Sequence, residues 1–246
     1  MKSSARRVAH TVEAMVSGLL TQPWRSHRRF EEQYLGRLLG HLKVDCVLDV
    51  GANIGQYAMM LREYSGYRGH IISFEPTPEP LAQLLRNSAH DALWHVQGVA
   101  LGNMTGTAKF RTLLSASVGN SFLPMIQEDV RGAEFAEIEV PVRRLSDLLP
   151  PLQKEYGFSR PFLKMDTQGF DLEVFAGAQD VIQSIVGLQS ELSVKPFYEG
   201  APDWLQALDV YQRAGFELST LFSNNTDWFP RLRELDCVLY RPSKER

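Results

Sequence analysis

The chain has 246 residues, a length that suits one large α/β domain with an extensive buried core. Its ordinary composition and formal net charge of −3 indicate a soluble globular protein and argue against nucleic acid as a partner. The charge is uneven, since residues 1–43 hold eight Lys or Arg against three acids and the remainder holds 18 against 26, so the two parts are expected to attract each other.

Residues 1–43 contain two stretches with apolar residues at helical spacing. One covers residues 5–20 and the other runs from Phe30 to about Lys43, with TQPWRSH as a break between them. They predict an N-terminal helical extension, residues 1–43, that covers a ligand site or contacts a partner. The first stretch is too short and polar to span a bilayer, although weak attachment of this basic segment to anionic lipid stays open. The default prediction is a cytoplasmic protein.

The run CVLDVGANIGQY, residues 46–57, predicts a strand, a tight turn and the start of a helix. Gly51 permits a positive φ or a close approach of bare backbone to a ligand, and Asn53 tolerates left-handed conformations better than most side chains. Gly55 lets the helix pack close to the strand, with the free N–H groups of its first turn facing the ligand. Asp49 suits a positively charged ligand and would repel a pyrophosphate. S-adenosylmethionine (SAM) carries an ammonium and a sulfonium and therefore fits.

A second apolar run, HIISFEP, ends at Glu75 and Pro76. An acid at this place can accept hydrogen bonds from both hydroxyls of an adenosine ribose. A third strand is predicted over residues 94–101, and its Ala100 and Leu101 would lie near the adenine by analogy with similar folds. Helices are predicted between these strands, over residues 56–64 and 80–88.

After residue 101 the pattern changes to short alternating runs. TAKFRT and EIEVPVRR predict an antiparallel β-hairpin insertion, with SASVGNSF in the loop between its strands. An insertion on a parallel sheet usually shapes a site. Two interpretations therefore stay open, a contribution to the acceptor pocket and a solvated hairpin.

The rest of the chain returns to an alternation of strands and helices. Strands are predicted over residues 161–166, 186–193, 216–222 and 236–242, and helices over residues 171–185 and 202–215. The last two strands are expected to pair antiparallel. This order predicts one α/β domain, residues 44–246, with a mostly parallel sheet covered on both faces. Cys46 and Cys237 fall in or beside strands and are expected to be buried and reduced, without a disulfide or metal site.

Three blocks resemble the FkbM family of SAM-dependent methyltransferases: VLDVGANIGQYAMML, ISFEPTPEPLAQL and FLKMDTQGFDLEVFAGA. The resemblance covers roughly residues 44–240, and the third block makes it specific. It implies a class I (Rossmann-like) methyltransferase fold, SAM as cofactor, and O-methylation of a small-molecule or glycan acceptor, with a sugar hydroxyl as the expected target. The cofactor-binding positions that it implies are Asp49, Gly51, Ala52, Asn53, Gly55, Tyr57, Glu75, Pro76, Ala100 and Leu101.

Methyl transfer to a hydroxyl needs a group that accepts the hydroxyl proton. Asp166 is the first candidate, because it ends the fourth core strand at the edge where open α/β sheets bind ligands, and Lys164 would pair with it. Gln168 stands where the family more often has Glu; its amide cannot take a proton but can orient substrate. Glu191 would project from the same edge and bind acceptor hydroxyls or, with Asp166, hold a divalent cation. Asp166, Gln168 and Glu191 are therefore the predicted catalytic residues.

Several alternatives stay open. Asp171 and Glu173 would fall in the first turn of a helix, where acids interact favourably with the helix dipole, so their role is structural or functional. An NAD-dependent oxidoreductase would fit the strand, turn and acid, but the sequence lacks a G-x-G-x-x-G motif. A non-catalytic SAM-binding regulatory or partner protein is favoured only by Gln168 in place of an acid.

Overall fold

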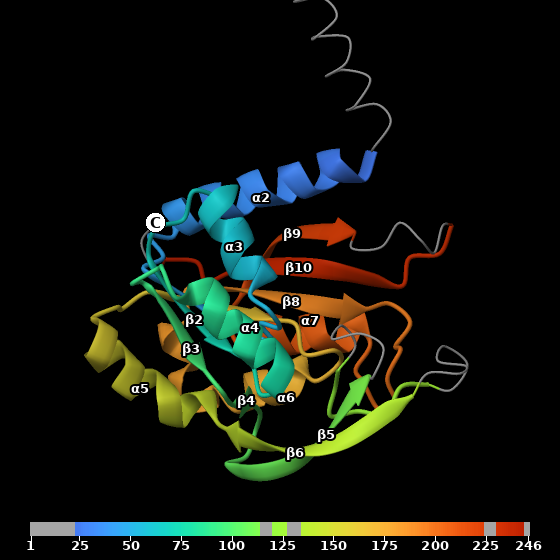
Figure 1. Cartoon of the computed structure of the whole chain (residues 1–246). Helices are drawn as coiled ribbons and strands as arrows, with labels where there is room; N and C mark the ends of the chain where they lie inside the picture. The colour runs from blue at the N-terminus through green and yellow to red at the C-terminus, as the bar shows by residue number, and fades with distance from the viewer. Residues whose placement is uncertain (1–22, 114–119, 127–133, 224–229, 244–246) are drawn as a thin grey trace, which may run out of the picture.

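A seven-stranded sheet forms the centre of the protein (Figure 1). The structure is a computed structural model and describes residues 23–113, 120–126, 134–223 and 230–243. Its strand order is β3-β2-β1-β7-β8-β10-β9. The strands are β1 (Cys46–Val50), β2 (His70–Phe74), β3 (Trp94–Gln97), β7 (Pro161–Met165), β8 (Gly187–Ser193), β9 (Glu217–Ser223) and β10 (Glu234–Tyr240). Strand β10 is antiparallel to β8 and β9, and the other pairs are parallel. The predicted sheet, mostly parallel with an antiparallel last strand, is confirmed.

Helices cover both faces of this sheet. Because successive side chains of each strand point to opposite faces, one strand can contribute apolar residues to the core on both sides. Cys46, Leu48 and Val50 of β1 pack in the core with α5, α6 and α7, whereas Val47 packs in the core with α2, α3 and α4. The helices are α2 (Pro23–His41), α3 (Gln56–Glu63), α4 (Pro78–Ser88), α5 (Leu145–Tyr156), α6 (Asp171–Ala176) and α7 (Trp204–Arg213). The same alternation turns the side chain of Asp49 toward α2 and α3.

Helix α2 is longer than the sequence predicted and belongs to the core. It already includes Pro23, so the described part of TQPWRSH, residues 23–27, is helical and is not the expected break. Leu35, Leu39 and Leu42 are buried against the sheet. The first predicted helix, residues 5–20, lies outside the described residues.

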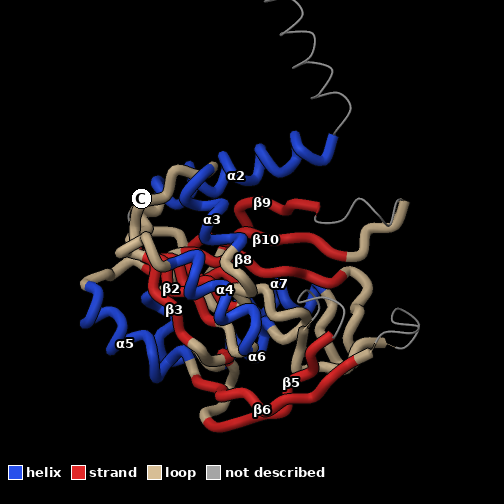
Figure 2. The backbone as a smooth tube through the Cα atoms, in the orientation of Figure 1, coloured by secondary structure: helices blue, strands red, loops and turns tan. Residues whose placement is uncertain are grey.

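The predicted third strand is two strands in two sheets. It ends at Gln97, and after Gly98 the chain leaves the main sheet; β4 (Ala100–Leu101) then pairs with β6 (Phe135–Arg143). Strand β5 (Gly106–Leu113) pairs antiparallel with β6, which confirms the hairpin. Figure 2 shows this three-stranded sheet below the main sheet in that view.

Two helices also differ from the prediction. Helix α5 was not predicted, because Pro150 and Pro151 interrupt its pattern and proline removes a backbone donor. The helix predicted over residues 171–185 is divided into α6 and a 3-10 helix, Gln179–Ser184. At Gly177 the chain passes so close to its neighbour that a Cβ would lie 2.0 Å from the carbonyl oxygen of Gly102. The helix is thus interrupted where the chain packs against the residue that follows β4 of the second sheet.

Cys46 and Cys237 are buried free thiols, as expected. Within the described ranges, no helix combines the length and the apolar character that a bilayer crossing needs.

Candidate active site

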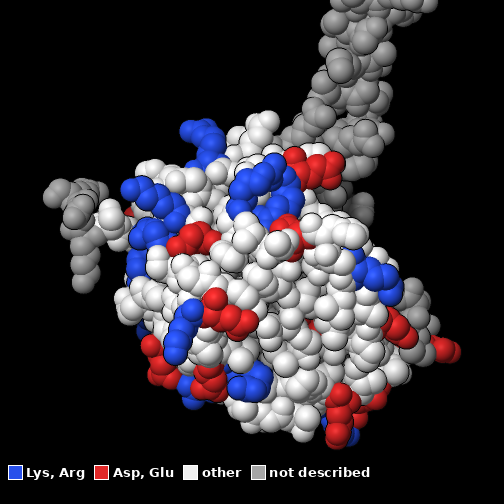
Figure 3. Space-filling model, turned by 60° about the vertical axis from the view of Figure 1, so that its left-hand side comes forward, with Lys and Arg blue, Asp and Glu red and all other residues white. Residues whose placement is uncertain are grey.

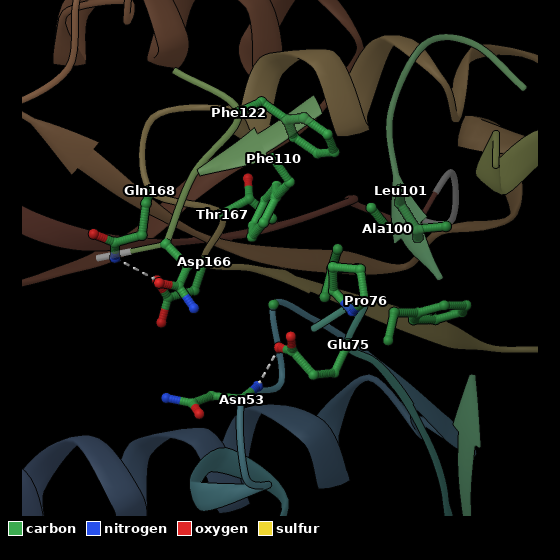
Figure 4. A pocket seen from close by; sticks show the side chains of 14 residues that line it. Asn53, Glu75, Pro76, Ala100, Leu101, Phe110, Phe122, Asp166, Thr167 and Gln168 are labelled. Atoms are coloured by element: carbon green, nitrogen blue, oxygen red, sulfur yellow. Dashed lines mark hydrogen bonds between the residues drawn. The ribbon is translucent and has the colours of Figure 1, made fainter. Parts of the chain in front are cut away.

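A pocket opens at the carboxyl ends of β1, β2 and β7 (Figure 4). The loops after these strands form its floor, and β4, β5 and residues 120–122 of the hairpin loop form a wall. The lining residues are Val50, Gly51, Asn53, Phe74, Glu75, Pro76, Ala100, Leu101, Phe110, Asn120, Phe122, Asp166, Thr167 and Gln168. This is the edge at which open α/β sheets bind their ligands.

The turn after β1 has the backbone that its residue types predicted. Gly51 has φ 75° and Asn53 has φ 49°, both left-handed. A Cβ on Gly51 would lie 2.0 Å from the carbonyl oxygen of Asp166, so only glycine lets the turns after β1 and β7 meet. Gly55 has φ 93° and packs against Trp94, which brings α3 close to the sheet.

Glu75 is held rigidly at one side of the pocket, where it is 6% exposed. Its carboxylate accepts hydrogen bonds from the backbone N–H of Asn53 at 2.8 Å and of Thr77 at 2.9 Å, and from the Thr77 hydroxyl. Burial raises the pKa of Glu75, and these hydrogen bonds oppose the rise. The loops therefore present a fixed acceptor to the pocket.

Asp49 lies beneath the pocket and does not line it, contrary to the sequence prediction. Its carboxylate is 0% exposed, pairs with Lys164 Nζ at 3.1 Å and accepts a hydrogen bond from Ser73 Oγ at 3.2 Å. Burial alone would lower the pKa of Lys164, but Asp49 and then Asp166 raise it above its ordinary value. The positive partner of Asp49 is thus an internal ammonium.

The other residues predicted for the cofactor divide in the same way. Ala52 is buried, Gly55 packs on Trp94, and the Tyr57 hydroxyl donates to Gln189 Oε1 at 2.8 Å, so these three stand behind the pocket. The predicted residues that do line it are Gly51, Asn53, Glu75, Pro76, Ala100 and Leu101.

The three predicted catalytic residues meet in one hydrogen-bonded group. Gln168 Nε2 donates to Asp166 Oδ1 at 3.0 Å and to Glu191 Oε2 at 3.1 Å, and the Tyr198 hydroxyl donates to Gln168 Oε1 at 2.9 Å (Figure 4 shows the first bond). Gln168 has φ 54°, a strained conformation for a side chain of its size. Lys164 Nζ lies 3.6 Å from the other oxygen of Asp166.

This geometry disfavours the metal alternative. An amide NH₂, which only donates, lies between the carboxylates of Asp166 and Glu191, where a cation would need to lie. Among the residues that the structure describes, no group of three or more His, Cys, Asp or Glu side chains could hold a metal ion.

Further acids adjoin this group on the sheet. Burial and then Asp166 raise the pKa of Glu191 well above its ordinary value and the pKa of Glu234 to about 7. Burial, followed by Glu31 and Asp166, raises the pKa of Asp236. The carboxyl end of β8 and the adjacent amino end of β10 therefore disfavour additional negative charge.

The sequence profile described as the methyltransferase FkbM domain matches residues 49–218, more than half of the chain. The chain belongs to the FkbM methyltransferase family. No curated protein matches its sequence. This family assignment agrees with the class I methyltransferase fold.

Several solved structures are similar to this chain, and the first one below agrees with it at the level of the fold. The N-methyltransferase NodS from Bradyrhizobium japonicum WM9 is similar over 90% of this chain and 98% of its own, with a TM-score of 0.50 and 8% identity. The methyltransferase FkbM from Methylobacillus flagellatus KT is similar over 80% of this chain at 16% identity and a TM-score of 0.49. The present chain spans only 44% of the length of that FkbM protein.

The pocket of this FkbM methyltransferase fits SAM on its own residues. Gly51 presents bare backbone to the pocket, and Glu75 offers a fixed acceptor for ribose hydroxyls. Leu101, Phe110 and Phe122 form an apolar wall suited to an adenine ring.

The sequence prediction included Leu101 but missed the two aromatic residues of that wall. Phe110 and Phe122 pack edge to face with ring centroids 4.7 Å apart, and both line the pocket with Asn120. The hairpin therefore shapes the pocket and is not merely solvated. Phe110 alternates with polar residues in TAKFRT, which marks it as the inward position, but the sequence alone does not indicate what it faces.

Asp171 has a structural role. Its carboxylate accepts from Thr167 N at 2.9 Å, Thr167 Oγ1 at 2.5 Å, Ser190 Oγ at 2.7 Å and Glu191 N at 3.2 Å. It thus ties the turn after β7 to β8 and has little remaining capacity for a ligand. Glu173 accepts a hydrogen bond from Asn103 on the far side of the pocket wall.

Proposed function

We propose that this methyltransferase transfers the methyl group to a hydroxyl of a small-molecule or glycan acceptor, with a sugar hydroxyl as the expected target and Asp166 as the proton acceptor. The observation that carries the proposal is the Asp166 side chain, which lines the pocket, is 44% exposed and has both oxygens held, one by Gln168 and the other by Lys164. A carboxylate so placed is open to an acceptor and fixed in direction.

SAM bound in this pocket would supply an electrophilic methyl group to the acceptor oxygen, in a displacement that would leave the electron pair of the carbon–sulfur bond on sulfur. Asp166 takes the hydroxyl proton during that step and later releases it to water. Glu75 and the Gly51 turn hold the cofactor, and the aromatic wall excludes water. Alignment by such residues contributes on the order of 7 to 11 kcal/mol in favourable cases.

Surface charge supports a small acceptor. On the face seen in Figure 3, Lys and Arg side chains are interspersed with Asp and Glu, unlike the continuous basic stripe of a nucleic-acid groove. The buried free thiols of Cys46 and Cys237 suit the reducing cytoplasm, which we propose as its compartment.

Asp166→Asn tests the proposal, because it keeps the shape and removes the base. Turnover with a panel of sugar acceptors should fall roughly 100-fold to 10,000-fold, while SAM affinity changes little. Asp209→Asn is the matched control, since Asp209 is also an exposed acid beside a cation, Arg213, but lies far along the chain on α7. Near-parental turnover in Asp166→Asn would remove the proton-acceptor role.

Calorimetry decides between the cofactor alternatives. The protein should bind SAM and S-adenosylhomocysteine, and NAD weakly or not at all, because the pocket contains Asp166 and Glu75 but no basic residue among its lining. Tight NAD binding without a response to S-adenosylhomocysteine would favour the oxidoreductase. Tight S-adenosylhomocysteine binding without turnover on any acceptor would favour the non-catalytic partner protein.

A further inference from the structure

A buried ammonium lies directly under the exposed carboxylate of the site. Lys164 is 6% exposed and lies in the middle of the sheet, beside Asp49 of the adjacent strand. Its Nζ is 3.1 Å from Asp49 Oδ1 and 3.6 Å from Asp166 Oδ2. One cation therefore links an acid that water cannot reach to an acid that faces the pocket.

The ammonium is fixed from below as well. It lies 5.2 Å from the centroid of the Tyr57 ring, a cation–π contact, and the Tyr57 hydroxyl is held by Gln189 Oε1 at 2.8 Å. Gln189 Nε2 in turn donates to Glu31 of α2 at 3.1 Å. This chain of contacts explains why Tyr57 and Asp49 occur in the first motif although neither lines the pocket.

Asp166 needs such a neighbour because acids face it from several elements. Glu191 of β8, Glu234 and Asp236 of β10 and Asp171 of α6 all interact unfavourably with its negative charge. The other groups that face it are the neutral Gln168 amide and the Tyr198 hydroxyl. Lys164 is the cation that contacts it among the described residues, and a fixed cation at this distance favours the ionised form of a carboxylate.

We propose that Lys164 is a positioning residue for methyl transfer: held by Asp49 and the Tyr57 ring, its ammonium contacts the Asp166 carboxylate and stabilises it in place against the acids of β8 and β10. The proposal rests on the proposed role of Asp166. It assigns Asp49 the task of holding Lys164 rather than the cofactor.

The test needs a variant that removes the ammonium and still folds. Lys164→Met alone leaves Asp49 buried without a cation, which is strongly destabilising, whereas removal of both charges is often tolerated. We therefore compare Asp49→Asn, which keeps the ammonium, with the double variant Asp49→Asn/Lys164→Met. Arg62→Met is the matched control, because Arg62 forms a partly buried ion pair with Asp91 at 2.7 Å and neither residue lines the pocket.

The first readout does not depend on turnover. The titration midpoint of the Asp166 carboxyl, followed by ¹³C NMR and assigned with Asp166→Asn, should move up by roughly one pH unit or more in the double variant. It should not move up in Asp49→Asn, which keeps the ammonium, or in Arg62→Met. An unmoved midpoint in a folded double variant would overturn the role of Lys164.

The second readout separates this inference from the proposed function. The double variant should bind S-adenosylhomocysteine with near-parental affinity, and the acid limb of its pH–turnover profile should move to higher pH by the same amount as the midpoint. A purely structural role would instead lower the melting temperature and leave the pH profile in place, which contradicts the proposal. If the midpoint moves but Asp166→Asn keeps full turnover, the effect of Lys164 stands and proton acceptance by Asp166 fails.

Discussion

The Gln168 amide lies between the carboxylates of Asp166 and Glu191, so these two acids need neither a cation nor a shared proton between them. Its NH₂ group donates to Asp166 and Glu191, and Tyr198 satisfies its carbonyl oxygen, so every strong hydrogen-bonding atom of the amide is used. A glutamate, which the family more often has here, would bring a third carboxylate to the same place. The substitution is thus compensated by the geometry around it and does not argue for a non-catalytic protein.

Gln168→Glu should expose this dependence. Both donated bonds are lost and a new acid meets two others, so its pKa in the fold should lie above the ordinary value. Such an acid stabilises the fold at low pH and loses that contribution as the pH rises through its folded pKa. The loss of melting temperature should therefore be larger at pH 8 than at pH 5 by thermal denaturation. Gln168→Met removes the hydrogen bonds without adding charge, so its loss of melting temperature should be the same at pH 5 and pH 8. The same pH dependence of that loss in both variants would contradict this interpretation.

Glu75→Gln should weaken cofactor binding. One charge-assisted hydrogen bond is typically worth about 1.5 to 3 kcal/mol, so the dissociation constant for SAM should rise roughly 10-fold to 150-fold by calorimetry. Thr77→Val is the matched control, because it removes the hydroxyl that donates to Glu75 but keeps the carboxylate. A folded Glu75→Gln protein with parental affinity would place Glu75 outside the ribose site.

At the scale of residues, the sequence could indicate Glu75, Asp166 and Glu191 because each ends or nearly ends a strand at the ligand edge. It could not indicate that the Asp49 carboxylate is buried and paired with Lys164. The alternation of β1 places that carboxylate on the face of α2 and α3, but its partner Lys164 comes from a distant part of the chain. Whether an acid in this motif meets a ligand or an internal cation depends on that tertiary contact.

Two turns from different strands meet at the floor of the pocket, in a contact as close as the one between Gly177 and Gly102. The turn after β1 approaches the turn after β7 at Gly51, where there is no room for a side chain. The same turn also donates both Gly51 N and Ala52 N to the carbonyl oxygen of Phe74 in β2, so three strands are joined there.

Gly51→Ala should therefore lower the stability of the fold by more than the strain of a left-handed alanine alone, because the new methyl group would also meet the Asp166 carbonyl oxygen. Gly66 provides the control, since it has φ 69° against 75° for Gly51 but has nothing within 4 Å of the place that a Cβ would take. Gly66→Ala should lower the melting temperature by about 2 to 4 °C, the effect of roughly 1 kcal/mol in a domain of this size. Gly51→Ala should lose at least about twice as much and should no longer bind S-adenosylhomocysteine. Equal shifts in the two variants would show that the close approach is relieved cheaply.

The element order could be predicted because each core strand is a short apolar run between helical patterns. The failures have local causes. Helix α5 carries two prolines yet buries Leu145, Leu149 and Leu152, so burial overrides propensity. The passage of the chain from β3 to the second sheet at Gly98 depends on pairing with β6, which no local pattern reveals.

The distribution of acids over the whole sheet predicts a pH dependence of stability. Glu191, Glu234 and Asp236 all have raised pKa values, first because of burial and then because of neighbouring acids, and that of Glu234 rises from 4.5 to about 7. Acids with raised values stabilise the fold fully below their ordinary pKa, and this stability is lost as the pH rises through the folded value.

The melting temperature should accordingly fall between pH 5 and pH 8, as followed by circular dichroism. Glu234→Gln should reduce the fall, because the amide has no proton to lose. Glu217→Gln is a suitable control on the neighbouring edge strand, where the acid accepts a hydrogen bond from the exposed Tyr240 hydroxyl. A melting temperature that rises over this range, or a fall that Glu234→Gln leaves unchanged, would contradict the prediction.

Strand β9 pairs only with β10 among the described strands, although β10 comes later in the chain. A ribosome therefore delivers β9 before the strand that will hold it, and β10 must enter between two strands made earlier. During that interval β9 presents an open backbone edge together with Leu218 and Leu221, which remain 39% and 40% exposed even afterwards. The nascent chain is thus most vulnerable to aggregation, and most attractive to a chaperone that binds extended apolar segments, at the moment just before β10 arrives.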